Sequence, residues 1–254
     1  MLGAIYGDKA GSLYEYEQLK EIKPIDPKEL ILPNSFYSDD TIETIAIMDS
    51  IINNKDYGST LREYILKYQD YMPNHSPYFK SMFTDNTINW ATRIKKIKSK
   101  GNGAMMRISP VGYLFNDEAL VIKNAYYATM TTHNTPEALY GAVTIALLIY
   151  HFRIGLSRDE IFDKLELNVE YKPFEKFNCT CSDTLGNCLY AIYNSNSFED
   201  AIRRVLLMGG DTDTNACIVG SVAEAMYGMS DKQKNDAIEG LPDEFVNVLK
   251  RVYK

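Results

Sequence analysis

The most informative segment of this chain is Gly209-Gly210-Asp211-Thr212-Asp213-Thr214, which leads directly into an apolar segment. Within that segment Ala216, Gly220 and Ala223 recur at spacings that place them on one face of a helix. Small side chains on one face allow a second helix to approach closely. The stretch therefore predicts a tightly packed helix from about residue 214 to 226, with two carboxylates at its start.

A second acidic cluster, Ser38-Asp39-Asp40-Thr41, also precedes a helical pattern. Two interpretations are open. Asp, Ser and Thr are preferred helix N-caps, and Asp40 followed by Glu43 fits a capping box. A cap uses one acid, however, whereas each cluster supplies two. If the clusters meet, their charges repel unless a cation or shared protons neutralise them, and oxygen donors suit Mg²⁺, Mn²⁺ or Ca²⁺. Together the clusters predict a metal site.

The composition of the chain is that of an ordinary globular protein. It has 254 residues, of which 45% are hydrophobic and 24% charged, and a net charge of −7. This charge argues against nucleic acid as a partner, because phosphate binding relies on Lys and Arg. Three histidines and four scattered cysteines give little support to a zinc site. No signal peptide or membrane-spanning run is evident, so we expect a cytoplasmic protein that does not bind membranes.

Helix signals dominate the chain, and strand patterns are scarce. Thr135-Pro136-Glu137 predicts a helix start, Ser157 with Glu160 forms a capping box, and Ser197 precedes a third helix. Near the first residues, three glycines at four-residue spacing, at positions 3, 7 and 11, predict tight helix packing. We therefore expect one all-α domain, a compact multi-helix bundle spanning residues 1–254.

Two polar stretches, from about 68 to 103 and from about 171 to 183, are predicted to be loops that carry function. The first ends in the glycine-rich Gly101-Asn102-Gly103, which is either a plain turn or a loop whose N–H groups cradle phosphate. His133 stands just before a predicted helix start, where ligands often bind. Glu15, one helical turn beyond Gly11, is an isolated acid whose role is open.

Five segments, in this order, resemble the ADP-ribosylglycohydrolase family, which contains dinitrogenase reductase-activating glycohydrolases and ADP-ribosyl-acceptor hydrolases. They are GAIYGDKAGSLYE (3–15), YSDDT (37–41), GNGAMMRISP (101–110), THNTP (132–136) and GGDTDT (209–214). The resemblance covers nearly the whole chain. It implies an all-helical fold with a binuclear Mg²⁺ (or Mn²⁺) centre. It also implies an enzyme that hydrolyses the N- or O-glycosidic bond between ADP-ribose and a modified protein or small molecule.

The resemblance also implies roles for single residues. The implied metal ligands are Ser38, Asp39, Asp40, Asp211, Asp213 and Thr214. The implied catalytic residues are Glu15, which matches the family's mobile acid near the scissile bond, with Asp39 and Asp213. The implied substrate-binding residues are Ser99, Lys100, Gly101, Asn102, Gly103 and His133. Ser38 departs from the Thr usual in the family, but its hydroxyl can still coordinate a cation.

The resemblance suggests a mechanism in which the distal ribose binds the metal pair and a water, metal-bound or polarised by Glu15, attacks the anomeric carbon. The competing hypothesis is a non-catalytic member that binds ADP-ribose or has a structural role. A decayed member is expected to have lost acidic ligands, and this chain keeps them together with Glu15. The sequence therefore favours the enzyme.

Overall fold

The computed structural model describes residues 1–71, 83–93 and 98–253, and within them the chain is built of helices without a sheet. The first part contains α1 (Leu2–Gly11), α2 (Glu15–Gln18), α3 (Asp39–Ile52), α4 (Tyr57–Tyr68), α5 (Asp85–Arg93), α6 (Gly103–Met106), α7 (Ser109–Leu114) and α8 (Glu118–Met130). The second part contains α9 (Pro136–Arg153), α10 (Arg158–Lys164), α11 (Cys181–Asn194), α12 (Phe198–Leu206), α13 (Thr212–Tyr227), α14 (Asp231–Ile238) and α15 (Asp243–Leu249). The all-α prediction is confirmed.

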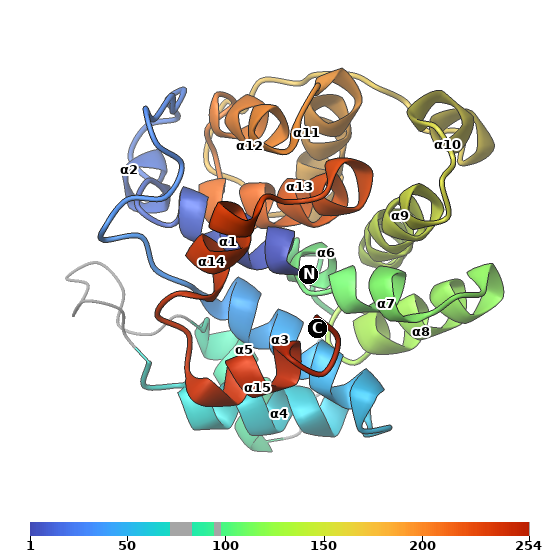
Figure 1. Cartoon of the computed structure of the whole chain (residues 1–254). Coiled ribbons are helices and arrows are strands. Elements are labelled where there is room, and N and C mark those ends of the chain that lie inside the picture. The colour runs from blue at the N-terminus through green and yellow to red at the C-terminus, as the bar shows by residue number, and fades with distance from the viewer. Residues whose placement is uncertain (72–82, 94–97, 254) are drawn as a thin grey trace.

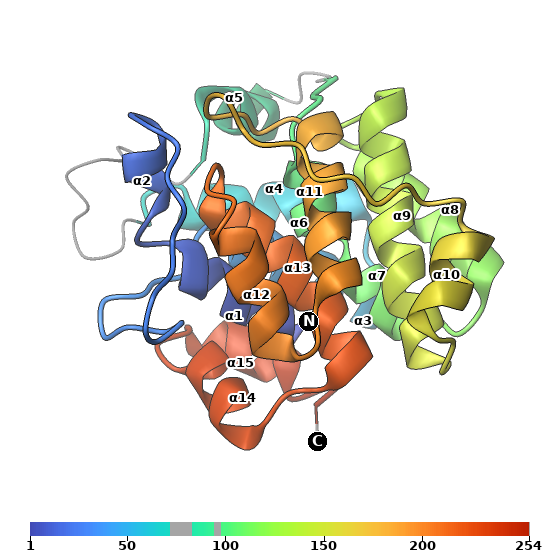
Figure 2. The ribbon, with the colours of Figure 1, turned by 90° about the horizontal axis from the view of Figure 1, so that it is seen from above.

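Helices α1 and α13 form the centre of the bundle, although they come from opposite ends of the chain (Figures 1 and 2). Helices α9, α11 and α12 also pack against α13, and α3 and α14 pack against α1. One continuous hydrophobic core runs through these layers. The arrangement places the N-terminal ends of α3 and α13 close to the C-terminal half of α1.

The contact between α1 and α13 is made through small residues on both helices. A Cβ added to Gly7 would lie 1.9 Å from the carbonyl oxygen of Ala216, and one added to Gly3 would lie 2.2 Å from that of Gly220. No side chain fits in such a space, so backbone packs directly on backbone. The glycine row near the start and the small-residue face of the later helix were each predicted to pack tightly, and they pack against each other.

Most helix boundaries follow the capping signals in the sequence. Pro136 lies in the first turn of α9, and Ser157 and Glu160 form a reciprocal capping box at the start of α10. Ser197 accepts a hydrogen bond from the N–H of Asp200 at the start of α12. Helix α13 ends at Gly228, whose positive φ of 73° suits glycine.

The capping box considered for Asp40 and Glu43 is not formed. The N-cap of α3 is Ser38, whose hydroxyl accepts from the N–H of Asp40, so Asp40 is inside the helix. Glu43, assigned to a capping box with Asp40, instead forms a buried ion pair with Arg107. The carboxylate of Asp40 is thereby left available for other partners.

One predicted loop was partly wrong. Residues 85–93 of the stretch expected to be a loop form α5, which buries Trp90 against the guanidinium of Arg62. Residues 72–82 and 94–97 of the same stretch lie outside the described residues. The second predicted loop agrees better, because the backbone from 171 to 180 is non-helical and α11 begins only at Cys181.

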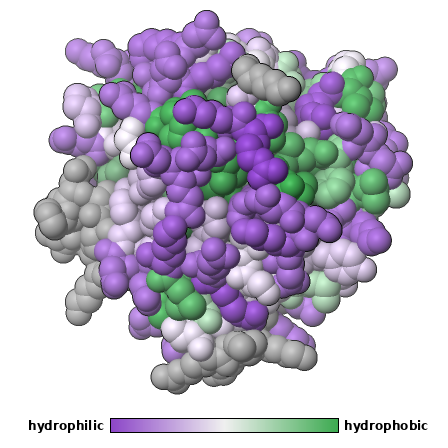
Figure 3. Space-filling view, turned by 60° about the horizontal axis from the view of Figure 1, so that its bottom comes forward, coloured by the Kyte–Doolittle hydropathy of each residue, from purple (hydrophilic) through white to green (hydrophobic). Residues whose placement is uncertain are grey.

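The surface is mixed in character. In the face drawn in Figure 3, hydrophilic side chains predominate, with smaller hydrophobic patches between them, which is usual for a folded protein. Among the described residues, none of the helices combines the length and the apolar character needed to cross a bilayer.

Candidate metal centre and adjoining cavity

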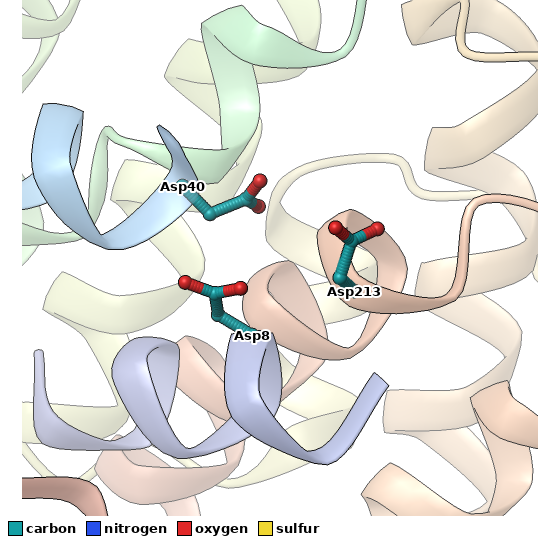
Figure 4. Close-up of side chains that lie close together, drawn as sticks. All are labelled: Asp8, Asp40 and Asp213. Carbon is teal, nitrogen blue, oxygen red and sulfur yellow. The ribbon is translucent and has the colours of Figure 1, made fainter. Parts of the chain in front are cut away.

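Three buried aspartates from three helices point toward one another at the centre of the bundle (Figure 4). Asp8 lies on α1, Asp40 in the first turn of α3, and Asp213 in the first turn of α13. Each offers a carboxylate oxygen, and these oxygens lie within 4.8 Å of one another. Such a cluster repels itself strongly unless it is protonated or neutralised by a cation. All its donors are carboxylate oxygens, which suit a hard divalent ion.

A second group of acids adjoins the first. Glu15, Asp211 and Asp213 also offer oxygens within 4.8 Å of one another, so Asp213 belongs to both groups. Two glycines set the direction of the chain just before Asp211, because Gly209 and Gly210 have φ of 69° and 81°. These left-handed conformations turn the backbone sharply into α13.

Asp8 also joins α1 to the start of α3. Its Oδ2 accepts hydrogen bonds from the N–H of Ser38 at 2.9 Å, from the N–H of Thr41 at 3.1 Å and from the Thr41 hydroxyl. Its other oxygen, Oδ1, is buried without a hydrogen-bond partner, as is Oδ1 of Asp40. Buried carboxylate oxygens without partners are rare. Their presence here fits a site that binds a cation.

Burial and mutual repulsion raise the pKa values of the acids of the centre. Burial raises the pKa of Asp8 to about 6. Burial, with the neighbouring charges of Asp211 and Asp8, raises the pKa of Glu15 to about 8. The pKa values of Asp40 and Asp213 are also well above their usual range, mainly because both groups are buried. Without a cation, the centre therefore retains protons near neutral pH.

The acidic centre opens into a cavity of about 580 Å³. The predicted site residues that line this cavity are Glu15, Asp39, Asp40, Ser99, Gly101, Asn102, Gly103, His133, Asp211, Asp213 and Thr214. Asp39 is partly exposed on the wall and belongs to neither of the two acidic groups. The acids thus lie on the wall of the cavity that also holds the glycine-rich loop.

Two predicted residues lie off the cavity wall. Ser38 is fully buried, and its hydroxyl lies 3.2 Å from Oδ2 of Asp40. The exposed ammonium of Lys100 pairs with Glu137 at 2.9 Å, and Lys100 contributes to the loop through its carbonyl oxygen, which accepts from the N–H of Cys181. Neither side chain faces the cavity directly.

The glycine-rich loop is held from two sides by backbone hydrogen bonds. The N–H of Ser99 donates to Thr132 at 3.1 Å, and the N–H of Asn102 donates to Cys179 at 2.8 Å. The side-chain amide of Asn102 donates to Oδ2 of Asp211 at 2.8 Å. This last bond ties the loop to the acidic centre, so the two features keep a fixed relative position.

Sequence reasoning gave no role in the site to Asp8, Glu43 or Thr132, and it considered Arg107 only as a charge that could assist phosphate binding at the glycine-rich loop. Asp8 stands inside the predicted packing motif of α1, where its neighbours gave the stronger signal. The other three line the cavity, with the Arg107 guanidinium paired to Glu43 and bonded to the Thr132 hydroxyl. An arginine among apolar residues in Met105-Met106-Arg107-Ile108 was the available signal for a buried ion pair.

The family model described as ADP-ribosylglycohydrolase matches residues 1–253. A putative ADP-ribosyl glycohydrolase of Acanthamoeba polyphaga mimivirus is 24% identical over 89% of this chain and 85% of its own length. ADP-ribosylarginine hydrolase Tri1 of Serratia proteamaculans is 28% identical, over 54% of this chain and 42% of its own length.

Two further comparisons agree with this match. ADP-ribosyl-[dinitrogen reductase] glycohydrolase of Rhodospirillum rubrum is 24% identical over 69% of this chain and 57% of its own length. A solved structure titled ADP-ribosylglycohydrolase-related protein complex superposes with a TM-score of 0.69 at 19% identity, over 97% of this chain and 90% of that one, which shows a shared fold. Because the family model matches residues 1–253, the chain belongs to the ADP-ribosylglycohydrolase family.

Proposed function

We propose that this protein is a metal-dependent hydrolase that cleaves the glycosidic bond between ADP-ribose and a modified acceptor and releases ADP-ribose. The observation that carries the proposal is the convergence of five acids from distant parts of the chain on one centre, which opens into a cavity beside a glycine-rich loop. The relatives named as hydrolases of ADP-ribosylarginine and of ADP-ribosyl-[dinitrogen reductase] support this reaction class.

The proposed cofactor is Mg²⁺ or Mn²⁺, as two ions. Asp8, Asp40 and Asp213 would hold one ion, and Asp211 and Asp213 would hold the second, with Glu15 beside them. The unpartnered Oδ1 atoms of Asp8 and Asp40 fit this role. Bound ions of this kind orient a sugar diol and lower the pKa of water. The hydroxyl of Thr214, 3.2 Å from Oδ2 of Asp40, would help to hold that carboxylate in place.

Glu15 is the proposed proton carrier. It begins a helix of four residues, α2, and its partly exposed carboxyl lines the cavity. Its carboxylate lies beside the acids that would hold the ions, where it can accept a proton from a water, as a general base requires. Glu15 would take the proton of the attacking water, while Asp39 and Asp213 would stabilise positive charge that develops on the ribose.

The loop from residue 99 to 103 is the proposed binding site for the diphosphate. Gly101 and Gly103 line the cavity with the hydroxyl of Ser99, and His133 lies beside them. The N–H groups of Ser99, Gly101 and Asn102 already donate within the protein, so the N–H of Gly103 and the side chain of Ser99 are the proposed donors to phosphate oxygens. The cavity thereby offers an anion site next to a cation site, which matches the diphosphate and the adjoining distal ribose of ADP-ribose.

The proposal is tested by incubating the purified protein with arginine- and serine-ADP-ribosylated peptides and measuring free ADP-ribose. Release is expected with Mg²⁺, and its loss is expected in EDTA and in Asp213→Asn. Glu15→Gln is expected to bind Mg²⁺ but to release ADP-ribose at least about 100-fold more slowly. Full activity of Asp213→Asn in EDTA would rule out metal-dependent catalysis at this centre. ADP-ribose binding without release from any peptide would favour the non-catalytic alternative.

A further inference from the structure

Four side chains of the cavity wall are linked to one another by hydrogen bonds. Glu43 on α3 pairs with the Arg107 guanidinium, and Nη2 of Arg107 lies 2.6 Å from Oγ1 of Thr132. The same hydroxyl lies 2.6 Å from Nδ1 of His133. Both distances are short for hydrogen bonds. His133 is therefore connected through Thr132 to a buried ion pair.

The direction of these hydrogen bonds follows from what each group can donate. A guanidinium has donors and no acceptor, so Arg107 donates and the Thr132 hydroxyl accepts. Among the described residues, the hydroxyl has two hydrogen-bond neighbours, Nη2 of Arg107 and Nδ1 of His133. The hydroxyl therefore donates its single proton to Nδ1, which accepts the hydrogen bond through its lone pair.

The opposite arrangement costs a hydrogen bond. If Nδ1 carried the proton, the hydroxyl would accept from both neighbours and its own proton would point at neither. Thr132 is only 5% exposed, so that proton would be left in the interior without an acceptor, which is unfavourable. A doubly protonated ring is disfavoured as well, because burial and the charge of Arg107 hold the pKa of His133 well below its usual range.

We propose that Arg107 and Thr132 are positioning residues that fix His133 as a neutral imidazole with its proton on Nε2, so that it presents an N–H donor to the cavity. The Nε2 atom lies beside the glycine-rich loop, 3.4 Å from the position of a Cβ added to Gly103 and 3.7 Å from that of one added to Gly101. His133 is thereby assigned to hydrogen-bond an oxygen of the ligand. It has no free lone pair with which to act as a base toward the cavity.

The identity of that oxygen rests on the proposed function, in which the loop binds the diphosphate of ADP-ribose. A neutral donor suits this position because it binds an anionic oxygen without placing a second cation next to Arg107. The tautomer itself does not depend on the ligand. It can therefore be measured in the free protein, independently of whether the protein hydrolyses anything.

The test is two-bond ¹H–¹⁵N NMR of the protein labelled with ¹⁵N-histidine. The chain has three histidines, at 75, 133 and 151, and His133→Gln identifies the signals of interest. We expect Nδ1 of His133 at the shift of a bare ring nitrogen and Nε2 at that of a protonated one, unchanged from pH 6 to 8. A proton on Nδ1, or a cationic ring in that range, would overturn the proposal.

Thr132→Val keeps the shape of the side chain and removes the hydroxyl, and Thr132→Ser keeps the hydroxyl as the matched control. We expect mixed tautomers in the Val variant and the original tautomer in the Ser variant. ADP-ribose binding, measured by calorimetry, is expected to weaken about tenfold in the Val variant and little in the Ser variant. Unaltered NMR shifts in the Val variant would refute the positioning role. If the Val variant shows an altered tautomer but the wild-type protein does not bind ADP-ribose, the positioning role is upheld and the proposed ligand is refuted.

Discussion

At the scale of single residues, Asp8 connects the fold to the chemistry. Its Oδ2 accepts three hydrogen bonds from the start of α3, while its Oδ1 has no partner. We predict that Asp8→Asn abolishes the rise in Tm caused by Mg²⁺ and lowers turnover at least about 100-fold. The amide oxygen can still accept hydrogen bonds and the repulsion is reduced, so the Tm in EDTA should not fall.

Asp49 provides the matched control for this substitution. It is a buried aspartate on the same helix as Asp40, but it pairs with Lys55 at 2.8 Å, away from the cavity. Asp49→Asn should lower the Tm in EDTA and leave the response to Mg²⁺ intact. An Asp8→Asn protein that still gains stability from Mg²⁺ would remove Asp8 from the ligand set.

The sequence identified the acids of the two dense clusters but not Asp8. Two acids beside hydroxyls stand out, whereas Asp8 is a single acid in a helix whose glycines already explain its pattern. Its role arises only when α1 meets α3, and no local pattern encodes that contact. Asp40 shows the opposite problem. Its local sequence fitted a helix cap as well as a metal ligand, and the structure shows that Ser38 is the cap.

At the scale of elements, the contact between α1 and α13 holds the acids together. Gly7 lies where a Cβ would meet the backbone of Ala216, and it directly precedes Asp8. Gly7→Ala must push the two helices apart, because backbone atoms cannot move aside as a side chain can. We predict a loss of about 3 kcal/mol or more in the free energy of unfolding. Metal affinity should fall as well, since Asp8 and Asp213 separate; urea unfolding and Mg²⁺ titration measure the two effects.

Gly186 in α11 is the matched control for this prediction. A Cβ there would meet only one atom within 4 Å, the carbonyl oxygen of Glu170 at 3.8 Å. Gly186→Ala should stabilise the protein by up to about 1 kcal/mol, because alanine favours the helix. If Gly7→Ala were tolerated as well as Gly186→Ala, close helix contact would not be what holds the centre.

Helices could be predicted where the signal lies in the local sequence, but not where a helix depends on contacts with other helices. Caps at Ser157 and Ser197 are short-range rules, and both helices begin there. Helix α5 was missed because its sequence is polar and its helical state depends on burying Trp90 under Arg62, a contact with α4. Small-residue faces predicted that α1 and α13 would pack tightly, but they could not say that the partners were each other.

At the scale of the whole molecule, the acidic centre forms where helices from the first part of the chain meet α13 from its last part. Acids from α1, α2, α3 and α13 meet only in the complete bundle, so the charge of the centre acts on global stability. Burying this centre without a cation is costly, and binding of a cation to the folded state alone would offset that cost. The stability of the protein should therefore depend on pH and on metal together.

The pKa shifts give the sign of this dependence in the metal-free protein. The pKa of Asp8 rises from its ordinary 3.8 to about 6, and the pKa of Glu15 rises from 4.5 to about 8. Between the ordinary and the raised pKa of each group, the folded state therefore binds more protons than the unfolded state. Stability must then fall as pH rises through this window. In EDTA we predict a Tm that declines from pH 5 to pH 8, measured by calorimetry.

Magnesium should reverse this trend, because it binds the deprotonated acids and protons compete with it. The gain in Tm on adding Mg²⁺ is therefore expected to be larger at pH 8 than at pH 5. The double variant Asp8→Asn, Glu15→Gln removes two of the titrating groups and should make the decline in EDTA less steep. A wild-type Tm in EDTA that instead rises from pH 5 to pH 8 would mean that these carboxyls are not held protonated in the fold, and that another cation or hydrogen-bond donor already neutralises the centre.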